Sequence, residues 1–158
     1  SSIAEFGRSF GMSRVEAKGA ACEKLSMVGL DETFFDRRPS EVSGGQCQRA
    51  ALARALMVDP SVLVCDEITS ALDVTTQARI VSLVAELKKT MTVVFITHDL
   101  ALASNLSDKL LVMHEGKIVE QGETGAVISN PQCRYTLELL SAFCELNGAL
   151  DAACAGCR

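Results

Sequence analysis

The chain has 158 residues, a formal net charge of −5 at pH 7 and an apolar content of 48%. This length is typical of one domain, and the apolar content is enough for a hydrophobic core, which argues against a disordered chain. The acidic balance argues against nucleic acid as a main partner. No run of about 18 apolar residues occurs, so no membrane span is predicted. The N-terminal segment SSIAEFGRSF lacks the apolar core of a signal peptide.

The chain contains seven cysteines, and without a secretory signal reduced thiols are expected. Cys22, Cys47 and Cys65 fall in predicted helices or strands and are expected to be buried as small hydrophobic residues. Cys154 and Cys157 form a CxxC pair, a pattern that can hold a metal or carry redox chemistry. No βαβ unit precedes this pair and no second pair completes four ligands, so a flexible tail is the favoured interpretation.

The N-terminal part is predicted to contain one clear helix. Residues 1–11 show no clear hydrophobic period. Ser13 and Glu16 have the spacing of a capping box, which predicts a helix start, and Gly29 predicts its end. The following residues 30–41 are mostly polar and favour a connecting segment.

A small polar loop, Ser43-Gly44-Gly45-Gln46, leads into a helix predicted over Gln46–Met57. Two glycines let a backbone approach a ligand closely, and Ser43 can cap the helix. The first N–H groups of a helix lack internal partners and lie at the positive end of its dipole, so they form an anion site. A bare Ser-Gly-Gly is more often an ordinary loop-to-helix junction, so phosphate binding here depends on further motifs.

An apolar strand is predicted over Val62–Cys65, followed directly by Asp66 and Glu67. The pattern indicates a buried parallel strand that delivers carboxylates to the edge of the sheet where ligands bind. One carboxylate there can hold Mg²⁺, and a second can orient or deprotonate a water that attacks a phosphate. The alternative is a solvated acidic strand end.

A second buried strand is predicted over Thr92–Ile96, after an amphipathic helix over Thr75–Lys89. This strand is expected to bring Thr97 and His98 to the sheet edge that carries the two acids. A histidine beside two acids can donate a hydrogen bond to a γ-phosphate oxygen and position the attacking water.

The last third of the chain is predicted to contain short helices and a strand pair. These are a helix over Leu100–Leu106, strands over Lys109–Met113 and Lys117–Gln121, a turn and short helix over 122–129, and a helix over Cys133–Leu146. His114 falls in the turn between the strands, where a surface position is the preferred interpretation.

Together these motifs resemble the ATP-binding-cassette (ABC) ATPases. The matching segments are the signature loop Val42–Gln46, the Walker B strand Leu63–Asp66, the D-loop Ser70–Asp73 and the switch-histidine segment Ile96–Asp99. They occur in the family order, and the resemblance extends from about Met12 to Phe143. Two further segments, Gly11–Ala17 and Asn130–Leu140, are similar to the oligopeptide/dipeptide importer branch.

The chain departs from the family pattern at two positions. Cys47 follows the signature glutamine, where the family usually has a basic residue, and this puts a phosphate or interface contact in doubt. Ile68 follows the two acids, where the family usually has proline, and this substitution leaves the local backbone less restricted.

The resemblance implies a role for each site residue. Asp66 would serve Mg²⁺, Glu67 would activate water, His98 would contact the γ-phosphate and Asp73 would order a dimer interface. The signature residues Ser43, Gly44, Gly45 and Gln46 would close over ATP bound to the facing subunit. The implied partners are a second ABC ATPase subunit, in a head-to-tail dimer, and membrane permease subunits. The implied location is peripheral, on the cytoplasmic side of the cell membrane.

The resemblance predicts an α/β fold, the C-terminal part of a P-loop NTPase (RecA-like) ABC ATPase domain. A partial cassette is expected over 1–146, followed by a flexible tail over 147–158. Within the cassette we expect a helical signature subdomain over 1–57, a Walker B to switch-histidine core over 58–130 and a C-terminal helix over 131–146.

The phosphate-binding pattern G-x-x-x-x-G-K-[S/T] does not occur in these residues, and the sequence does not begin with Met. The expectation is therefore a fragment, a truncated gene product or half of a split subunit, inactive alone. The resemblance favours an ATPase of an importer for peptides or similar small solutes. The alternatives are an ABC ATPase outside transport and a non-catalytic partner that lends only its signature loop. The transported substrate is not readable from this sequence.

Overall fold

The structure is a computed structural model that describes residues 2–147. The chain forms two compact units, Ser1–Ile96 and Thr97–Arg158. The boundary between them falls inside the segment 58–130. The expected CxxC pair, Cys154 and Cys157, and the expected tail beyond Asn147 lie outside the described residues.

Three helices pack together in the first unit: α1 (Ser2–Ser9), α2 (Arg14–Met27) and α3 (Gly44–Ala55). α1 was not predicted, because residues 1–11 show no clear hydrophobic period. Ile3 of this helix is only 5% exposed, and the guanidinium of Arg54 in α3 lies 5.9 Å from the Phe6 ring centroid. An eight-residue helix is marginal alone, so these tertiary contacts account for α1.

Both ends of α2 follow the sequence prediction. The Ser13 amide donates to Glu16 Oε2 at 2.9 Å, and the Glu16 amide donates to Ser13 Oγ at 3.3 Å, which completes the capping box. At the other end Gly29 has a φ of 69°, and the Leu30 amide reaches back to the Leu25 carbonyl oxygen at 2.9 Å. This left-handed glycine is the Schellman stop that the sequence indicates.

An arginine of α3 holds the end of α2. Arg49 donates through one guanidinium nitrogen to the carbonyl oxygens of Val28, at 3.2 Å, and Gly29, at 2.8 Å. These carbonyls follow the last turn of α2, where oxygens lack helical partners. The helix α3, which follows the signature loop and is called the signature helix below, is thereby fixed to the end of α2. Between α2 and α3 the connecting residues form two 3-10 turns, η1 (Glu32–Phe35) and η2 (Pro39–Glu41).

The helix predicted over Gln46–Met57 begins and ends earlier than predicted. α3 starts at Gly44, and its continuation after Ala55 is a 3-10 turn, η3 (Leu56–Val58). Asp59 then adopts a φ of 43°, and its carboxylate accepts a 3.1 Å hydrogen bond from Lys24 in α2. A left-handed residue before Pro60 ends the helical path.

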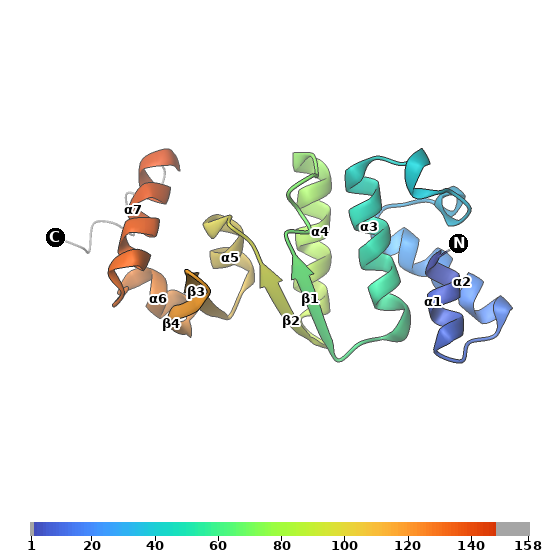
Figure 1. The fold of residues 1–158 in the computed structure, drawn as a ribbon, viewed down its shortest axis with the longest axis horizontal. Coiled ribbons are helices and arrows are strands. Elements are labelled where there is room, and N and C mark those ends of the chain that lie inside the picture. Colours follow the sequence, from blue (N-terminus) through green and yellow to red (C-terminus); the bar gives the residue numbers. More distant parts are fainter. Residues whose placement is uncertain (1, 148–158) are drawn as a thin grey trace. The chain divides into compact units, whose positions relative to one another are not determined.

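The sheet of the first unit has two parallel strands, β1 (Val62–Asp66) and β2 (Thr92–Ile96), connected by α4 (Val74–Leu87), as Figure 1 shows. The register pairs Val64 with Val94 and Asp66 with Ile96, so both strands end at the same level. The pairing confirms the parallel strand arrangement that the sequence predicts, and with α4 the two strands form a βαβ unit that was not itself predicted.

The predicted complete burial of the two strands is wrong. Leu63 and Cys65 are 4% and 1% exposed, whereas Val62 and Val64 are 54% and 61% exposed. The strand therefore alternates between a buried and an exposed face, because successive side chains point to opposite sides. The burial expected for the three cysteines is confirmed for Cys65 and wrong for Cys22 and Cys47, which are partly exposed.

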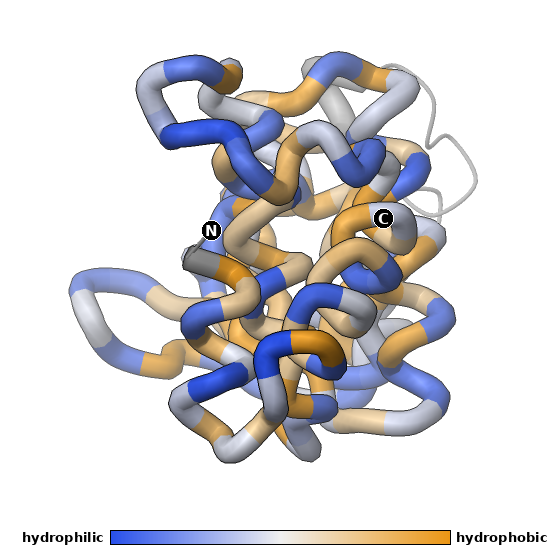
Figure 2. Tube along the Cα trace, turned by 90° about the vertical axis from the view of Figure 1, so that its right-hand side faces the viewer, coloured by the Kyte–Doolittle hydropathy of each residue, from blue (hydrophilic) through white to orange (hydrophobic). Residues whose placement is uncertain are grey.

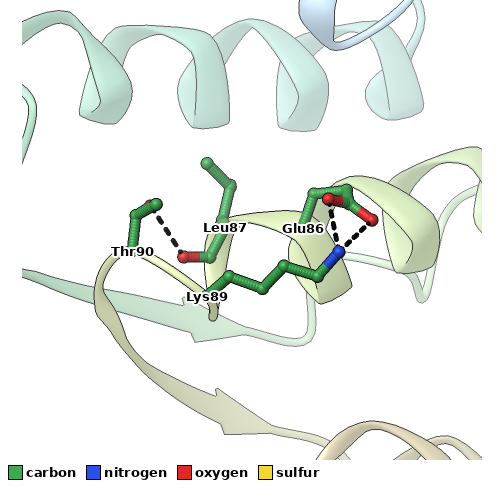
Figure 3. A network of polar contacts seen from close by, with 4 residues as sticks. All are labelled: Glu86, Leu87, Lys89 and Thr90. Atoms are coloured by element: carbon green, nitrogen blue, oxygen red, sulfur yellow. Dashed lines mark hydrogen bonds and ion pairs between the residues drawn. The ribbon is translucent and has the colours of Figure 1, made fainter.

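The helix α4 ends two residues before the predicted Lys89, in a turn held by local contacts (Figure 3). Lys89 Nζ lies 2.7 Å from Glu86 Oε2, and the Thr90 hydroxyl donates to the Leu87 carbonyl oxygen at 3.2 Å. The ion pair is solvent-exposed, so it adds little stability. The hydroxyl is a further donor to a carbonyl oxygen that already accepts from the amides of Thr90 and Met91, each at 3.0 Å.

The second unit confirms the predicted element order with small shifts. It contains α5 (Leu100–Leu106), β3 (Lys109–His114), β4 (Lys117–Glu123), α6 (Thr124–Ser129) and α7 (Arg134–Asn147). The antiparallel β3 and β4 meet at Glu115 and Gly116, whose φ values are 48° and 75°. Two positive φ values in a two-residue turn match the twist of the flanking strands.

His114 is the last residue of β3, so its predicted place in the turn is wrong, whereas its predicted surface position is confirmed because the residue is exposed. Its ring stacks on Tyr135 of α7 at 3.9 Å between centroids. The start of α7 is also held by Glu120 of β4, whose carboxylate accepts from the amides of Gln132, at 2.7 Å, and Cys133, at 3.1 Å. The Gln132 amide, followed by the Thr136 hydroxyl and then the Cys133 amide, lowers the pKa of Glu120. The segment 130–140 is therefore anchored to the hairpin.

None of the helices in residues 2–147 is long and apolar enough to cross a membrane. Figure 2 shows that polar residues interrupt the apolar stretches along the described trace.

Candidate functional site

The signature loop forms the first turn of α3. Ser43 is the N-cap residue, and its hydroxyl accepts a hydrogen bond from the Gln46 amide at 3.3 Å. The Gln46 side chain returns the bond, because its Oε1 accepts from the Ser43 amide at 2.9 Å. Both side chains are therefore occupied in a capping box. Gly44 and Gly45 fill the first two helical positions, where N–H groups have no partner inside a helix.

The two acids lie at the carboxyl end of β1, as the sequence predicts. Asp66 is the last residue of the strand, and both acids are exposed. Glu67 has a φ of 47°, which is uncommon for a residue with a side chain. Its amide donates to the Ile96 carbonyl oxygen at 3.0 Å, which fixes this backbone against the end of β2.

A tight turn connects Glu67 to the D-loop. The Ser70 amide and hydroxyl both donate to the Glu67 carbonyl oxygen, at 3.2 and 2.9 Å. The Leu72 amide donates to the Thr69 carbonyl oxygen at 3.2 Å, and Thr69 is only 7% exposed. The turn is therefore held to the Glu67 carbonyl oxygen by two hydrogen bonds from Ser70 and closed by the bond between Leu72 and Thr69.

Asp73 caps α4 with both carboxylate oxygens. Oδ1 accepts from the Thr76 amide at 2.9 Å, and Oδ2 accepts from the Thr76 hydroxyl at 2.7 Å. The Thr76 hydroxyl, followed by its amide, lowers the pKa of Asp73. We did not predict this cap, although an aspartate three residues before a threonine at a helix start is a readable signal.

The two signature glycines differ in their surroundings. A Cβ atom on Gly45 would lie 2.8 Å from Leu72 Cδ2 and 2.9 Å from the carbonyl oxygen of Ala71. A Cβ atom on Gly44 would meet nothing within 4 Å. The second glycine therefore allows the D-loop to lie directly against the signature helix, a contact that the sequence did not reveal.

His98 follows β2 by two residues and lies at the start of the second unit. Its backbone is held between two local contacts: the Asp99 amide donates to Thr97 Oγ1 at 3.0 Å, and Asp99 caps α5 through a 3.1 Å bond from the Leu102 amide. The His98 side chain is exposed.

Several known proteins are similar in sequence to this chain. The ABC transporter family profile matches residues 11–70. The chain is 44% identical over 133 residues to the oligopeptide transport ATP-binding protein OppF of Escherichia coli. The matched segment covers 83% of this chain and 40% of that protein. The chain belongs to the ABC transporter ATPase family.

Further matches agree with the oligopeptide/dipeptide branch. The chain is also 43% identical over 138 residues to the dipeptide transport ATP-binding protein DppF of Haemophilus influenzae. That match covers 86% of this chain and 42% of DppF. These relatives confirm the branch that residues 11–17 and 130–140 indicated. The cassette chain spans about two fifths of the length of the curated relatives named here.

Solved structures confirm the fold. A dimeric structure of a bacterial ABC transporter cassette matches with a TM-score of 0.67 and 34% identity, covering 72% of this chain and 50% of that one. A dimeric post-hydrolysis state of an ATP-binding cassette bound to ADP and Pi matches with the same values. The predicted α/β fold, corresponding to part of an ABC ATPase domain, is confirmed.

A groove of about 260 Å³ runs between α3 and β1 of the cassette chain. Its lining includes Gln48, Cys65, Asp66 and Ile68, and the remaining residues are alanine, leucine and valine. Such walls supply few of the N–H donors that phosphates need. No group of three or more potential metal ligands occurs within the described residues. The polar groups that the sequence predicts for phosphate chemistry therefore lie at the strand end and the signature turn, and the groove itself is mostly apolar.

Proposed function

We propose that this chain is part of the ATP-binding and hydrolysing subunit of an ABC importer for peptides or similar small solutes. The observation that carries the proposal is the pairing of a capped signature helix with a strand that ends on Asp66 and Glu67, in one compact unit. The names of the relatives, which are transport ATP-binding proteins for oligopeptides and dipeptides, support the substrate class.

The strand end supplies the groups for attack on the γ-phosphate of ATP. Mg²⁺ is held by one or two carboxylates, with phosphate oxygens and waters as further ligands, and the exposed Asp66 fits that donor set. When bound, Mg²⁺ neutralises charge on the phosphate oxygens. Glu67 accepts a proton from the attacking water, and His98 donates a hydrogen bond to the γ-phosphate.

The signature turn acts on a nucleotide held by a facing cassette. In the capping box the side chains of Ser43 and Gln46 act only as acceptors. The Ser43 hydroxyl proton, the Gln46 Nε2 group and the backbone N–H groups of Gly44 and Gly45 are therefore the donors offered to phosphate. Asp73 follows Leu72, which lies against Gly45, and we assign Asp73 to the same dimer interface. The partners are a second cassette in head-to-tail arrangement and membrane permease subunits, with the ATPase peripheral on the cytoplasmic face.

A segment exchange tests this proposal. Residues 12–143 replace the matching segment of Escherichia coli OppF, and the chimera is expressed in cells that lack OppF. We expect restored oligopeptide uptake and ATPase activity, and loss of both on Glu67→Gln. A chimera carrying the matching segment of the oligopeptide transport ATP-binding protein OppF of Haemophilus influenzae, which is 42% identical to this chain over 133 residues, controls for the exchange itself. A folded chimera without ATPase activity, beside an active control, would refute the proposal.

A second candidate function is a non-catalytic partner that lends its signature helix to a complete cassette. The signature turn with its complete capping box is the feature that this role requires, and it supports the second candidate. In that role Glu67→Gln leaves the ATPase rate of a mixed dimer unchanged, while a change at Gly45 lowers that rate. The ATPase rates of the two mixed dimers therefore distinguish the two functions.

A further inference from the structure

The contact between Gly45 and the D-loop connects the signature helix to the strand-end acid of the same chain. We propose that Gly45 is a positioning residue, which sets the backbone of Glu67 through Ala71 and Ser70. The catalytic meaning of this link rests on the proposed function, whereas the mechanical link does not.

The first step of the link is a fit between backbones. The Cα of Gly45 faces the carbonyl oxygen of Ala71, so that an added Cβ would be only 2.9 Å away. The Leu72 side chain lies against the same glycine, and the Ala71 carbonyl oxygen moves only with its loop. A displacement of the first turn of α3 is therefore passed to the loop backbone.

The second step leads from this loop to the acid. Ser70, the residue before Ala71, donates twice to the Glu67 carbonyl oxygen, through its amide and its hydroxyl. At the far end, Asp73 fixes the loop to α4 through Thr76. The loop is held at both ends, so it has little freedom to absorb a shift at Ala71.

The third step is the restricted backbone of the acid itself. Glu67 has a left-handed φ of 47°, and its amide is bonded to Ile96. Such a conformation persists only where its surroundings hold it. A shift of Ser70 therefore changes the direction in which the carboxylate leaves the backbone. In a dimer, a signature helix that closes on the partner's nucleotide thereby adjusts the acid of its own subunit, and by linkage the reverse holds.

Gly44 provides a matched control, because its added Cβ would meet nothing within 4 Å. We measure amide hydrogen exchange of the 158-residue chain without nucleotide, for Gly45→Ala, Gly44→Ala and the unaltered chain. We expect exchange at the Ser70 and Leu72 amides to rise at least severalfold in Gly45→Ala and to stay unchanged in Gly44→Ala. Unchanged exchange in Gly45→Ala, or an equal rise in both variants, overturns the proposal.

A second variant removes the side-chain part of the contact, which Leu72 makes with Gly45, without adding bulk. This variant keeps the test valid if Gly45→Ala does not fold. Leu72→Ala is expected to speed exchange of the Cys47 amide, which donates to the Ser43 carbonyl oxygen at 2.9 Å in the first turn of α3. Val74→Ala, at a position 84% exposed beside the loop, is the control and leaves this exchange unchanged. Equal effects of both variants, or none from Leu72→Ala, overturn the proposal.

The catalytic consequence is measured in the OppF chimera. We expect Leu72→Ala to lower kcat by roughly tenfold or more, since small misplacements of catalytic groups have effects of this size. The KM for ATP is expected to stay unchanged, and Leu72→Met is expected to restore kcat. A rise in KM alone, or no change, overturns the positioning role. An inactive parent chimera refutes the proposed function while the exchange results stand.

Discussion

The amide of Glu67 donates a 3.0 Å hydrogen bond to the carbonyl oxygen of Ile96. This bond extends the parallel pairing of β1 and β2 one residue beyond the register pair Asp66 and Ile96. The backbone of the proposed general base is therefore part of the sheet, while its side chain is exposed. The position of this acid depends on the pairing of two strands and on the turn that follows it.

The first prediction concerns the proposed base. Glu67→Gln keeps the shape of the side chain and removes its basicity, so the ATPase rate of the OppF chimera should fall by roughly 10²–10⁴. ATP binding should survive, and an ATP-bound dimer should accumulate on size exclusion. Glu86→Gln, at an exposed glutamate of α4, is the control and should retain the rate. A wild-type rate in Glu67→Gln would contradict the assignment.

The second prediction concerns the signature cap. Ser43→Ala removes the acceptor of the Gln46 amide and should lower the free energy of unfolding by about 1 kcal/mol. Ser43→Gly should cost only about a few tenths of a kcal/mol, because glycine is tolerated at an N-cap. Urea denaturation of the three chains measures the difference. Equal losses for alanine and glycine would argue against the cap.

These elements show what the sequence could and could not predict. The cap of α2, its glycine stop and the strands were predictable because each depends on residues only a few positions apart. α1 was not, because the burial of Ile3 and the contact of Phe6 with Arg54 involve distant parts of the chain. The fit of Gly45 against Ala71 joins residues 26 positions apart and leaves no local pattern.

The candidate site was likewise predictable from the sequence only in part. The order of Asp66, Glu67 and Asp73 along the chain predicted the candidate groups, because each follows or precedes a regular element. The occupation of Ser43 and Gln46 in a reciprocal cap could have been inferred from their spacing. The exposed face of β1 could not, because burial on each face of a strand depends on which elements pack there.

The third prediction concerns pH and Asp73. The Thr76 hydroxyl, followed by its amide, lowers the pKa of Asp73 from the value of 3.8 in an unstructured chain. A depressed folded pKa contributes stability that is present above 3.8 and is lost as pH falls below it. Thr76→Val removes the hydroxyl, so its stability should depend less on pH between 5 and 2 than that of the unaltered chain. Tm measured across this range checks the difference. Thr76→Ser keeps the hydroxyl and serves as the control.

The fourth prediction concerns the exposed face of the first unit's sheet. Val64 and Val94 are register partners on this face and are 61% and 45% exposed. Apolar strand surface of this kind promotes association. The double change Val64→Thr and Val94→Thr keeps β-branched shape and should reduce the self-association seen by sedimentation velocity. Val15→Thr, at a position 83% exposed on α2, should not. Equal association of all three chains would contradict the prediction.

The last prediction concerns nucleotide binding by residues 1–158 alone, which we expect to bind MgATP weakly and not to hydrolyse it. A triphosphate needs several N–H donors and a cation around it, as a P-loop provides. The phosphate-facing groups available here include two carboxylates, Asp66 and Glu67, which repel the ligand unless Mg²⁺ lies between them. The signature turn is proposed to face another subunit's nucleotide, so it does not compensate within one chain.

Isothermal titration of the purified chain with MgATP measures this affinity directly. We expect a dissociation constant weaker than about 10 μM, which corresponds to about −7 kcal/mol. Titration of Asp66→Asn shows whether this carboxylate strengthens binding through Mg²⁺ or weakens it by repelling the triphosphate. If the carboxylate acts through Mg²⁺, the variant should bind MgATP more weakly still, whereas ATP without Mg²⁺ should bind it better because a repelling charge has been removed. Tight MgATP binding that Asp66→Asn leaves unchanged would contradict the prediction and would indicate a phosphate site elsewhere in the chain.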